Sequence, residues 1–301
     1  MLRANCQIAN SSIDSANIPF TELPKRFIIL NHRNDKMPSV GVRVMTTQEK
    51  RSPLKGRPLR NPGQSLDEQI HDVLYDYIVW PVLFGVFMVI LAALEWIRYL
   101  RPITPSPGIY TFGAAAGAGF AAYRLFRAIP RLHALKLGRD GEKAVGQFLE
   151  TLRERGYRVF HDVVGNGFNV DHILIGPAGI FTVETKTRSK PRGDTRVTFD
   201  GEAIRINGFP PDRGPVIQAK AQACWLRELL DDSSGRRFDV RSVIVYPGWY
   251  VDERDIKQSA VWVLAPKRLV TFIDHEPRRL SEDDIHLASF HLSRFVRTAA
   301  Q

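Results

Sequence analysis

Cysteine is scarce in this chain of 301 residues, and two common catalytic motifs are missing. Cys6 and Cys224 are too few and too far apart for a disulfide framework or a cysteine-based zinc site, which fits a reducing compartment. There is no G-x-x-x-x-G-K-[ST] phosphate loop, so no NTP-driven step is expected. The nucleophile-elbow motif of Ser/His/Asp hydrolases is also missing.

The N-terminal part of the chain lacks regular periodicity. Met1 is not followed by an apolar run long enough for a signal peptide. Residues 1–66 show no sustained helical or strand pattern, and residues 50–60 are basic and rich in Gly and Pro, so we predict a disordered tail. Met45 would begin a more economical protein, which leaves an over-long gene prediction over residues 1–44 as an open alternative.

Acidic side chains are outnumbered. The chain has 42 Lys and Arg against 32 Asp and Glu, a formal charge of +10. This balance favours a polyanionic partner, either nucleic acid or the anionic headgroups of a lipid bilayer. Charge alone does not separate the two, although the basic stretch at residues 124–139 is the better candidate for lipid contact.

Two runs carry no charge at all. Residues 77–94 are dense in Val, Ile, Leu and Phe and would span roughly 27 Å as a helix. Residues 102–123 are convincingly apolar only from residue 109, and their Gly113 to Gly117 spacing suits close helix packing. We predict a transmembrane hairpin within residues 67–131, with spans near 77–94 and 105–123. The alternatives are a buried core helix for the first run and an interfacial segment for the second.

The basic flanks of these runs predict an orientation. Two spans place the flanks at residues 57–60 and 124–136 on the same side, and one span places Arg98 and Arg101 there instead. Either arrangement puts the C-terminal part in the cytoplasm at a bacterial-type inner membrane. Two spans would leave Arg98 and Arg101 in an outer loop, which the positive-inside tendency disfavours.

A β-hairpin is predicted for residues 169–187, with its turn at residues 176–179. If Ile175 and Ile180 flank the turn, residues whose numbers sum to 355 face each other across the two strands.

That register places Asp171 directly opposite Glu184, on the same face as Lys186. Two carboxylates in this position repel, so a compensating cation is expected. A divalent metal ion and Lys186 would supply the charge. The alternative is an ordinary Glu184/Lys186 ion pair on a solvated sheet face.

The order of these residues resembles a known family. Asp171 followed by Glu184-Thr185-Lys186 is the D…E-x-K core of the PD-(D/E)xK nucleases. Residues 137–250 resemble, more narrowly, the nuclease-related domain (NERD) family. The matching motifs are Gly138-Arg-Asp-Gly-Glu142, Asn169-Val-Asp171, Gly176-Pro-Ala-Gly-Ile-Phe181, Glu184-Thr-Lys186 and Pro215-Val-Ile-Gln218. A bare triplet occurs by chance, whereas the ordered series is specific.

The resemblance and the residue patterns together predict an α/β fold over residues 132–301, a restriction-endonuclease-like mixed central sheet flanked by helices, with a C-terminal extension. The elements expected from the patterns are a helix from Asp140 or Gly141 to Gly156, strands at 158–164, 242–246 and 260–264, a hairpin at 196–206, and helices at 215–230 and 281–297.

The resemblance also implies roles in the site. Asp171 and Glu184 would bind Mg²⁺ or Mn²⁺ together with the backbone carbonyl of Thr185. Lys186 would position or deprotonate the attacking water, and its pKa is expected to fall. Glu142 lies on the helix stripe that faces the sheet and would complete the metal shell. The alternative is that this glutamate is present only because the helix dipole favours a negative charge in the first turn.

Three further residues are assigned more loosely. Gln218 would orient Lys186 or touch substrate, or else is an ordinary surface residue. Asn169 would bind substrate or order the site, or make a strand-edge hydrogen bond. His172 points away from Asp171 and is interpreted as structural.

The sequence thus predicts a membrane-anchored, metal-dependent nuclease acting on DNA or RNA. The alternative is a non-catalytic, membrane-tethered adaptor that binds nucleic acid or protein on the same fold.

Overall fold

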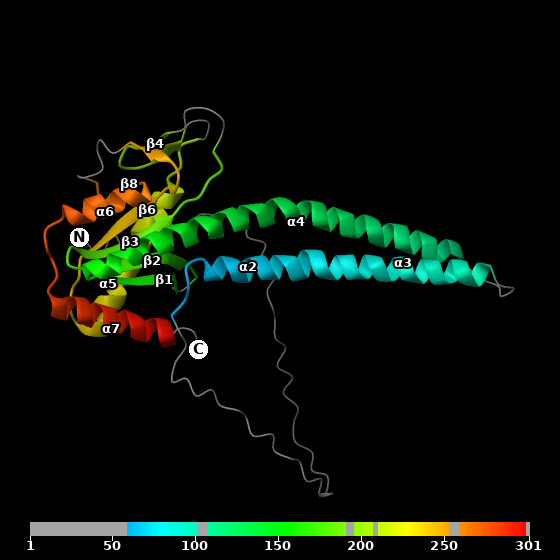
Figure 1. Ribbon diagram of the computed structural model, residues 1–301, viewed down its shortest axis with the longest axis horizontal. Helices are drawn as coiled ribbons and strands as arrows, with labels where there is room; N and C mark the ends of the chain where they lie inside the picture. Colours follow the sequence, from blue (N-terminus) through cyan, green and yellow to red (C-terminus); the bar gives the residue numbers. More distant parts are fainter. Residues whose placement is uncertain are drawn as a thin grey trace, which may run out of the picture.

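The structure is a computed structural model that describes residues 59–100, 107–165, 167–190, 196–206, 210–252 and 259–298. A long pair of helices extends from a compact α/β domain (Figure 1). Residues 1–58, which include Met45 and most of the expected tail, lie outside the described residues. The tail does not reach residue 66 as predicted, because the chain is helical from Gln64 onward.

The helix pair consists of one uninterrupted helical run and its return. The first arm comprises α2 (Gln64–Leu74), the π-helical turn η1 (Tyr75–Val79) and α3 (Trp80–Tyr99). The second arm is α4 (Pro107–Glu150), which runs back beside it into the domain (Figure 1). Glycines set the close approach: a methyl group at Gly117 would lie 3.2 Å from Met88 Cγ, and one at Gly85 would lie 3.5 Å from Ala121 Cβ.

The predicted start of the helix at Asp140 or Gly141 is wrong. α4 passes through both residues without a break and contains Pro130 in its interior. Tertiary packing overrides the local signals here, because Gly141 lies against Thr187, where even a methyl group would come within 1.9 Å of Oγ1. The glycine therefore serves close packing on the sheet and does not cap a helix.

Among the described residues, one helix is long and apolar enough to cross a membrane. It runs over Gln64–Tyr99, with a mean hydropathy of 2.5 in its most apolar window, and only 17% of that window is buried. Such exposure does not match a buried core helix: Leu83, Phe87 and Ile90 are each more than half exposed. α4 does not meet the same criterion, because its apolar part is rich in Ala and Gly, so a two-span hairpin is not shown.

The domain is built on a mixed sheet, as predicted. Its five strands lie in the order β1-β2-β3-β6-β8. The neighbours β1, β2 and β3 are antiparallel, whereas β3, β6 and β8 are parallel. The bounds are β1 (Arg158–Val164), β2 (Asn169–Gly176), β3 (Gly179–Thr185), β6 (Val240–Val245) and β8 (Val261–Leu264).

A second, smaller sheet was not predicted. It consists of β5 (Ile204–Ile206), β4 (Arg196–Phe199) and β7 (Tyr250–Val251). The hairpin expected at residues 196–206 is present as β4 and β5, but it pairs with β7 and does not extend the main sheet.

Helices cover both faces of the main sheet (Figure 1). The C-terminal end of α4, the short helix η2 (Thr151–Arg155) and α6 (Pro266–Asp274) pack on one face around Leu149 and Phe181. The helices α5 (Gly214–Ser234) and α7 (Glu282–Thr298) pack on the other face around Ile180 and Leu226. Alternation along β3 sends Phe181 and Ile180 to opposite cores, which fixes the strand between two helical layers. Of these helices, α6 was not predicted.

Candidate active site

The β2–β3 hairpin has the predicted register. Ile175 pairs with Ile180 and His172 with Val183, so paired residue numbers sum to 355. Gly176 must be a glycine, because a methyl group there would lie 2.1 Å from the Tyr157 ring. The register brings Asp171 to the end of β3, where its Oδ2 accepts a hydrogen bond of 2.7 Å from the Thr185 backbone amide.

Glu184 is buried and held by three donors. Its Oε1 accepts from Lys186 Nζ at 2.6 Å and from Gln218 Nε2 at 2.9 Å. Its Oε2 accepts from Gln222 Nε2 at 2.6 Å. Lys186 Nζ also donates to Gln218 Oε1 at 3.0 Å, which closes a triangle of three side chains. Because Glu184 is only 3% exposed, the alternative of a solvated sheet face does not hold at this residue.

Gln222 was missed by the sequence reasoning. It lies one helical turn after Gln218 on α5 and is buried. Its amide donates both to Glu184 and, at 2.9 Å, to the backbone carbonyl of Asn169. The four-residue spacing from Gln218 was the available signal.

The carboxyl groups of the site carry more negative charge than their surroundings balance. Burial, followed by the charges of Glu184 and Glu142, raises the pKa of Asp171 well above its ordinary value. Burial, followed by the charges of Asp162 and Glu184, raises the pKa of Glu142 to about 8. The structure therefore brings Glu142 from α4 to the same acidic cluster as the two hairpin carboxylates.

The pKa of Lys186 moves in the opposite direction from the one predicted. Burial lowers it, but the adjacent Glu184, and then Asp171 and Asp212, outweigh that effect, so the pKa lies above its ordinary value. Lys186 is thus a cation held between Glu184 and Gln218.

Asp162 on β1 is a second residue that the sequence reasoning missed. It is 1% exposed, has a φ of 47°, and lies across the β1–β2 ladder from Asp171, between the pairs His161↔His172 and Val163↔Val170.

Asp162 joins the first arm of the helix pair to the domain. Its carboxylate accepts hydrogen bonds from Arg60 Nε at 2.7 Å, from the Ser65 amide at 2.8 Å and from Ser65 Oγ at 2.7 Å. It also accepts from Asn169 Nδ2 at 3.2 Å. Asn169 therefore contacts Asp162 through its side chain and Gln222 through its backbone carbonyl. No pattern in the sequence pointed to this contact.

Residues 137–247 match the family model of the nuclease-related domain. The chain contains a NERD domain. The match runs from within α4 to the end of β6 and includes all the candidate site residues, consistent with the PD-(D/E)xK superfamily. It covers somewhat over a third of the chain and excludes the helices α2 and α3. No curated protein and no solved structure matches the chain.

The donor atoms of the NERD domain suit a hard cation. Asp171 Oδ1 accepts no hydrogen bond from the described residues, and Glu184 offers a second carboxylate beside it. Across the described residues, no group of three or more His, Cys, Asp or Glu side chains lies close enough together to hold a metal ion. Mg²⁺ commonly keeps several waters and needs only one or two carboxylates, so the pair Asp171 and Glu184 fits.

A buried chain of hydrogen bonds lies behind the hairpin in the NERD domain. Glu150 Oε1 lies 2.7 Å from His161 Nε2, the two Nδ1 atoms of His161 and His172 are 2.9 Å apart, and His172 Nε2 is 3.4 Å from Thr185 Oγ1. Burial lowers the pKa of both histidines. His172 is therefore a neutral, buried residue, which agrees with the structural role predicted for it.

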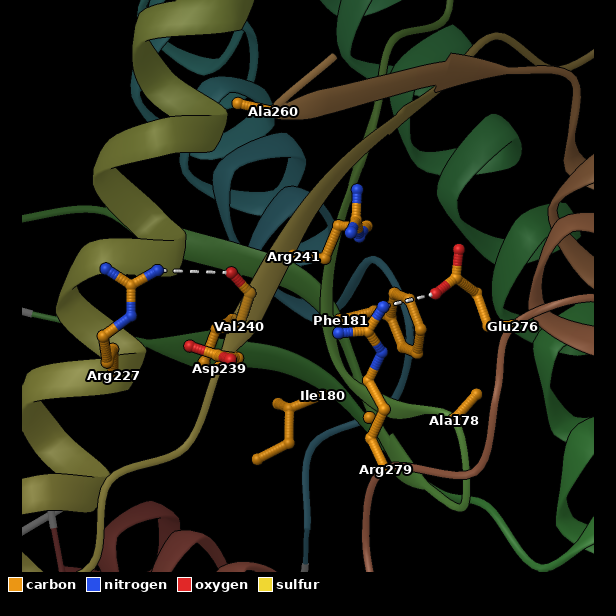
Figure 2. A pocket seen from close by; sticks show the side chains of 11 residues that line it. Ala178, Ile180, Phe181, Arg227, Asp239, Val240, Arg241, Ala260, Glu276 and Arg279 are labelled. Atoms are coloured by element: carbon orange, nitrogen blue, oxygen red, sulfur yellow. Dashed lines mark hydrogen bonds and ion pairs between the residues drawn. The ribbon is translucent and has the colours of Figure 1, made fainter. Parts of the chain in front are cut away.

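A pocket of about 230 Å³ lies at the other end of the main sheet, where β3 and β6 begin (Figure 2). Arg227 there donates to the Val240 carbonyl at 3.4 Å, and Arg279 pairs with Glu276 at 3.0 Å. None of the candidate site residues of the NERD domain lines this pocket. It is separate from the acidic cluster at the ends of β2 and β3.

Proposed function

We propose that the NERD domain is a divalent-metal-dependent nuclease that hydrolyses phosphodiester bonds of DNA or RNA. The observation that carries the proposal is the burial of Glu184 at the end of β3, held by Lys186 and two glutamines beside the charge-repelled Asp171. Burying charged groups together is costly and contributes little to stability. A metal ion bound beside these groups would offset the repulsion, so catalysis gives a reason for their burial.

Asp171, Glu184 and the Thr185 carbonyl would hold Mg²⁺ or Mn²⁺. The bound ion would make a water more nucleophilic and offset charge on the phosphate. The chain's own residues prepare the rest of the site. Lys186 keeps its proton and presents a positive charge where negative charge develops, and Gln218 fixes the position of that ammonium group.

Glu142 contributes a proton store. With a pKa of about 8 in the absence of a cation, it is mostly protonated at neutral pH. A cation at Asp171 and Glu184 lowers the cost of ionising Glu142, so binding is coupled to release of its proton. The ionised Glu142 carboxylate would then be able to accept a hydrogen bond from a water in the site.

One observation favours the adaptor alternative. Both oxygens of Glu184 already accept hydrogen bonds from protein donors, so the carboxylate is satisfied without a metal ion. An adaptor would retain this arrangement as a purely structural element.

Replacing Asp171 with Asn separates the two proposals. In the full chain purified in a neutral detergent, Mg²⁺ or Mn²⁺ should raise the melting temperature of the wild type, because a ligand at 100 times its Kd stabilises by about 2.7 kcal/mol. Asp171→Asn should lose this response together with cleavage of single- and double-stranded DNA and of RNA. Without metal the variant should be as stable as the wild type or slightly more so, since a like-charge contact disappears.

If the wild type cleaves none of these substrates and its melting temperature does not respond to either metal, the adaptor takes its place. Asp274→Asn, at an exposed ion pair with Arg155 on the far side of the domain, provides the matched control and should retain both properties.

We further propose that the first arm of the helix pair anchors the protein in a bacterial-type inner membrane, with the NERD domain in the cytoplasm. The support is the exposure of large apolar side chains on the part of α3 that does not pack against α4. The apolar half of α4, which packs against α3 through Gly117, would enter the bilayer with it. The positively charged side chains of residues 124–139 would then lie on the cytoplasmic side.

The anchor predicts that the full chain stays with membranes after an alkaline carbonate wash that removes peripheral proteins. Phe87→Lys/Ile90→Lys should weaken this retention, because a lysine at the centre of a span costs about 2.5 to 3.5 kcal/mol. Phe290→Lys, at an equally exposed phenylalanine of α7, should remain in the membrane fraction. Recovery of unwashed wild-type protein in the soluble fraction would overturn the anchor.

A further inference from the structure

A groove of about 550 Å³ crosses the surface of the domain between α7, the end of η2 and the start of β1. It contains none of the candidate site residues. Its lining has four arginines and one histidine, and no aspartate or glutamate of the described part of the chain lines it. The helix α7 forms one wall, and Leu59, which precedes the first arm, closes one side.

The wall formed by α7 is a single helical stripe. Its groove-lining residues recur at intervals of three and four, as required for one face of a helix. They are His286, Ser289, Phe290, Ser293, Arg294, Arg297 and Thr298. Ile285, Ala288 and Leu292 lie on the opposite face and are buried against the sheet. The stripe is therefore directed into the groove by the packing of the helix.

Three of the groove arginines have no acidic partner. Arg153 is held by Glu150 and by the Val159 carbonyl, but Arg158, Arg294 and Arg297 form no ion pair with any described residue. All three are exposed. Unpaired guanidinium groups in a groove without carboxylates create a positive potential that favours a polyanion.

The groove also offers an aromatic surface. Phe290 is 55% exposed and lies on the same stripe as Arg294 and Arg297. Arginines that contact phosphates beside an aromatic ring that stacks a base are the combination that binds single-stranded nucleic acid. The hydroxyl groups of Ser289 and Ser293 add further donors for phosphate oxygens.

We propose that this groove binds the sugar-phosphate backbone of single-stranded nucleic acid and leads it toward the candidate active site. The inference rests on the proposed nuclease function. Phe160 lines the groove, and Asp162 lies two residues further along β1, roughly 7 Å at the rise of a strand. On the other side, Leu59 lines the groove and the adjacent Arg60 contacts Asp162. Phe160 and Leu59 thus place this side of the groove next to Asp162, which lies across the β1–β2 ladder from Asp171.

Lipid headgroups fit the groove less well than nucleic acid. α2 and η1 place 16 residues between the start of the first arm and the apolar helix α3, about 24 Å of helix. The groove is on the domain side of that start, and Figure 1 shows α7 beside it at the end of the pair opposite the tip of α3. A bilayer around α3 would lie far from Arg294 and Arg297.

The test compares Arg294→Gln/Arg297→Gln with the wild-type full chain in a neutral detergent. The probe is a fluorescein-labelled 20-nucleotide single strand of mixed sequence, followed by anisotropy in EDTA so that no cleavage occurs. Loss of two phosphate contacts should lower the slope of log K against log salt by about 1.4 and weaken binding roughly tenfold at 0.15 M salt. Lys267→Gln/Arg278→Gln removes the same charge elsewhere on the domain and should change binding little.

Phe290→Ala should weaken binding severalfold while leaving the salt slope unchanged, because stacking involves no counterion release. Equal binding by the wild type and by Arg294→Gln/Arg297→Gln would overturn the proposal that the groove binds nucleic acid. Equal losses of affinity in that variant and in the control variant would overturn it as well. A variant that keeps oligonucleotide binding but carries less phosphatidylglycerol in native mass spectrometry would instead show a lipid site. Since binding is measured without metal, failure of the nuclease proposal leaves this result intact.

Discussion

Lys186→Ala is expected to abolish cleavage while the metal-dependent rise in melting temperature remains. Lys186 Nζ donates to Glu184 at 2.6 Å and to Gln218 at 3.0 Å and keeps its positive charge, so its removal would take away the cation that the proposed reaction places beside the phosphate. Loss of such a preorganised group commonly costs on the order of 10²- to 10³-fold in rate. The two carboxylates that would hold the metal ion are untouched. Single-turnover cleavage and thermal unfolding with and without Mn²⁺ measure the two effects separately.

Stability must be followed in the same experiment, because Lys186 is also the ion-pair partner of a buried carboxylate. Breaking such a pair destabilises a protein by about 3 to 5 kcal/mol. Lys186→Gln retains a hydrogen-bond donor toward Glu184 and is expected to fold better while remaining inactive. Lys190→Ala, four residues further along and exposed, should behave as wild type. If Lys186→Gln cleaved at the wild-type rate, the residue would be a structural partner only.

Glu142→Gln is expected to stabilise the metal-free protein at alkaline pH and to change little near pH 5. Burial and the charges of Asp162 and Glu184 raise the pKa of Glu142 from 4.5 to about 8. Between these two values the folded protein holds a proton that the unfolded chain has released, so the free energy of unfolding falls as pH rises through this window. Above about pH 8 the loss is complete, on the order of 5 kcal/mol at about 1.4 kcal/mol per pH unit. Glutamine never ionises and avoids it.

Chemical unfolding of both proteins in EDTA at pH 5 and pH 9 measures this difference. The free energy of unfolding of Glu142→Gln should increasingly exceed that of the wild type as pH rises. Glu154→Gln, an exposed position in η2, provides the control for removing one carboxylate. A gap that stayed constant with pH would show that Glu142 is not held within the acidic cluster.

The register of the hairpin could be predicted because local chemistry determines it. The turn at Pro177 and Ala178 and the pairing of Ile175 with Ile180 set every other contact along β2 and β3. Asp171 and Glu184 were located together by that rule alone. The neighbours that come from distant elements could not be found this way, since no period connects Asp162 on β1 or Gln222 on α5 to the hairpin.

The errors have a common cause, which is tertiary contact overriding local preference. Glycines at 138 and 141 and an aspartate at 140 would end or start an isolated helix, yet α4 continues because it is packed on both sides. The direction of the Lys186 pKa was predicted wrongly, because the charges of Glu184 and Asp171 outweigh burial in the folded protein and their distances depend on the tertiary structure. The net charge of +10 likewise gave no position for the groove, which depends on how α7 rotates on the sheet.

Because α4 is one continuous helix, the number of residues in it determines the direction in which the candidate active site faces relative to α3. Gly117, which packs on α3, and Glu142, which reaches the acidic cluster, lie on one continuous helix with Pro130 between them. Each residue inserted into α4 between these two positions would rotate the domain by about 100° around the helix axis and shift it by about 1.5 Å relative to α3. One inserted residue would swing the cluster to another side of the hairpin, whereas seven would restore the azimuth to within roughly 20°. The number of residues between Gly117, which contacts α3, and Gly141, which contacts Thr187 in the domain, thus determines the direction in which the site faces.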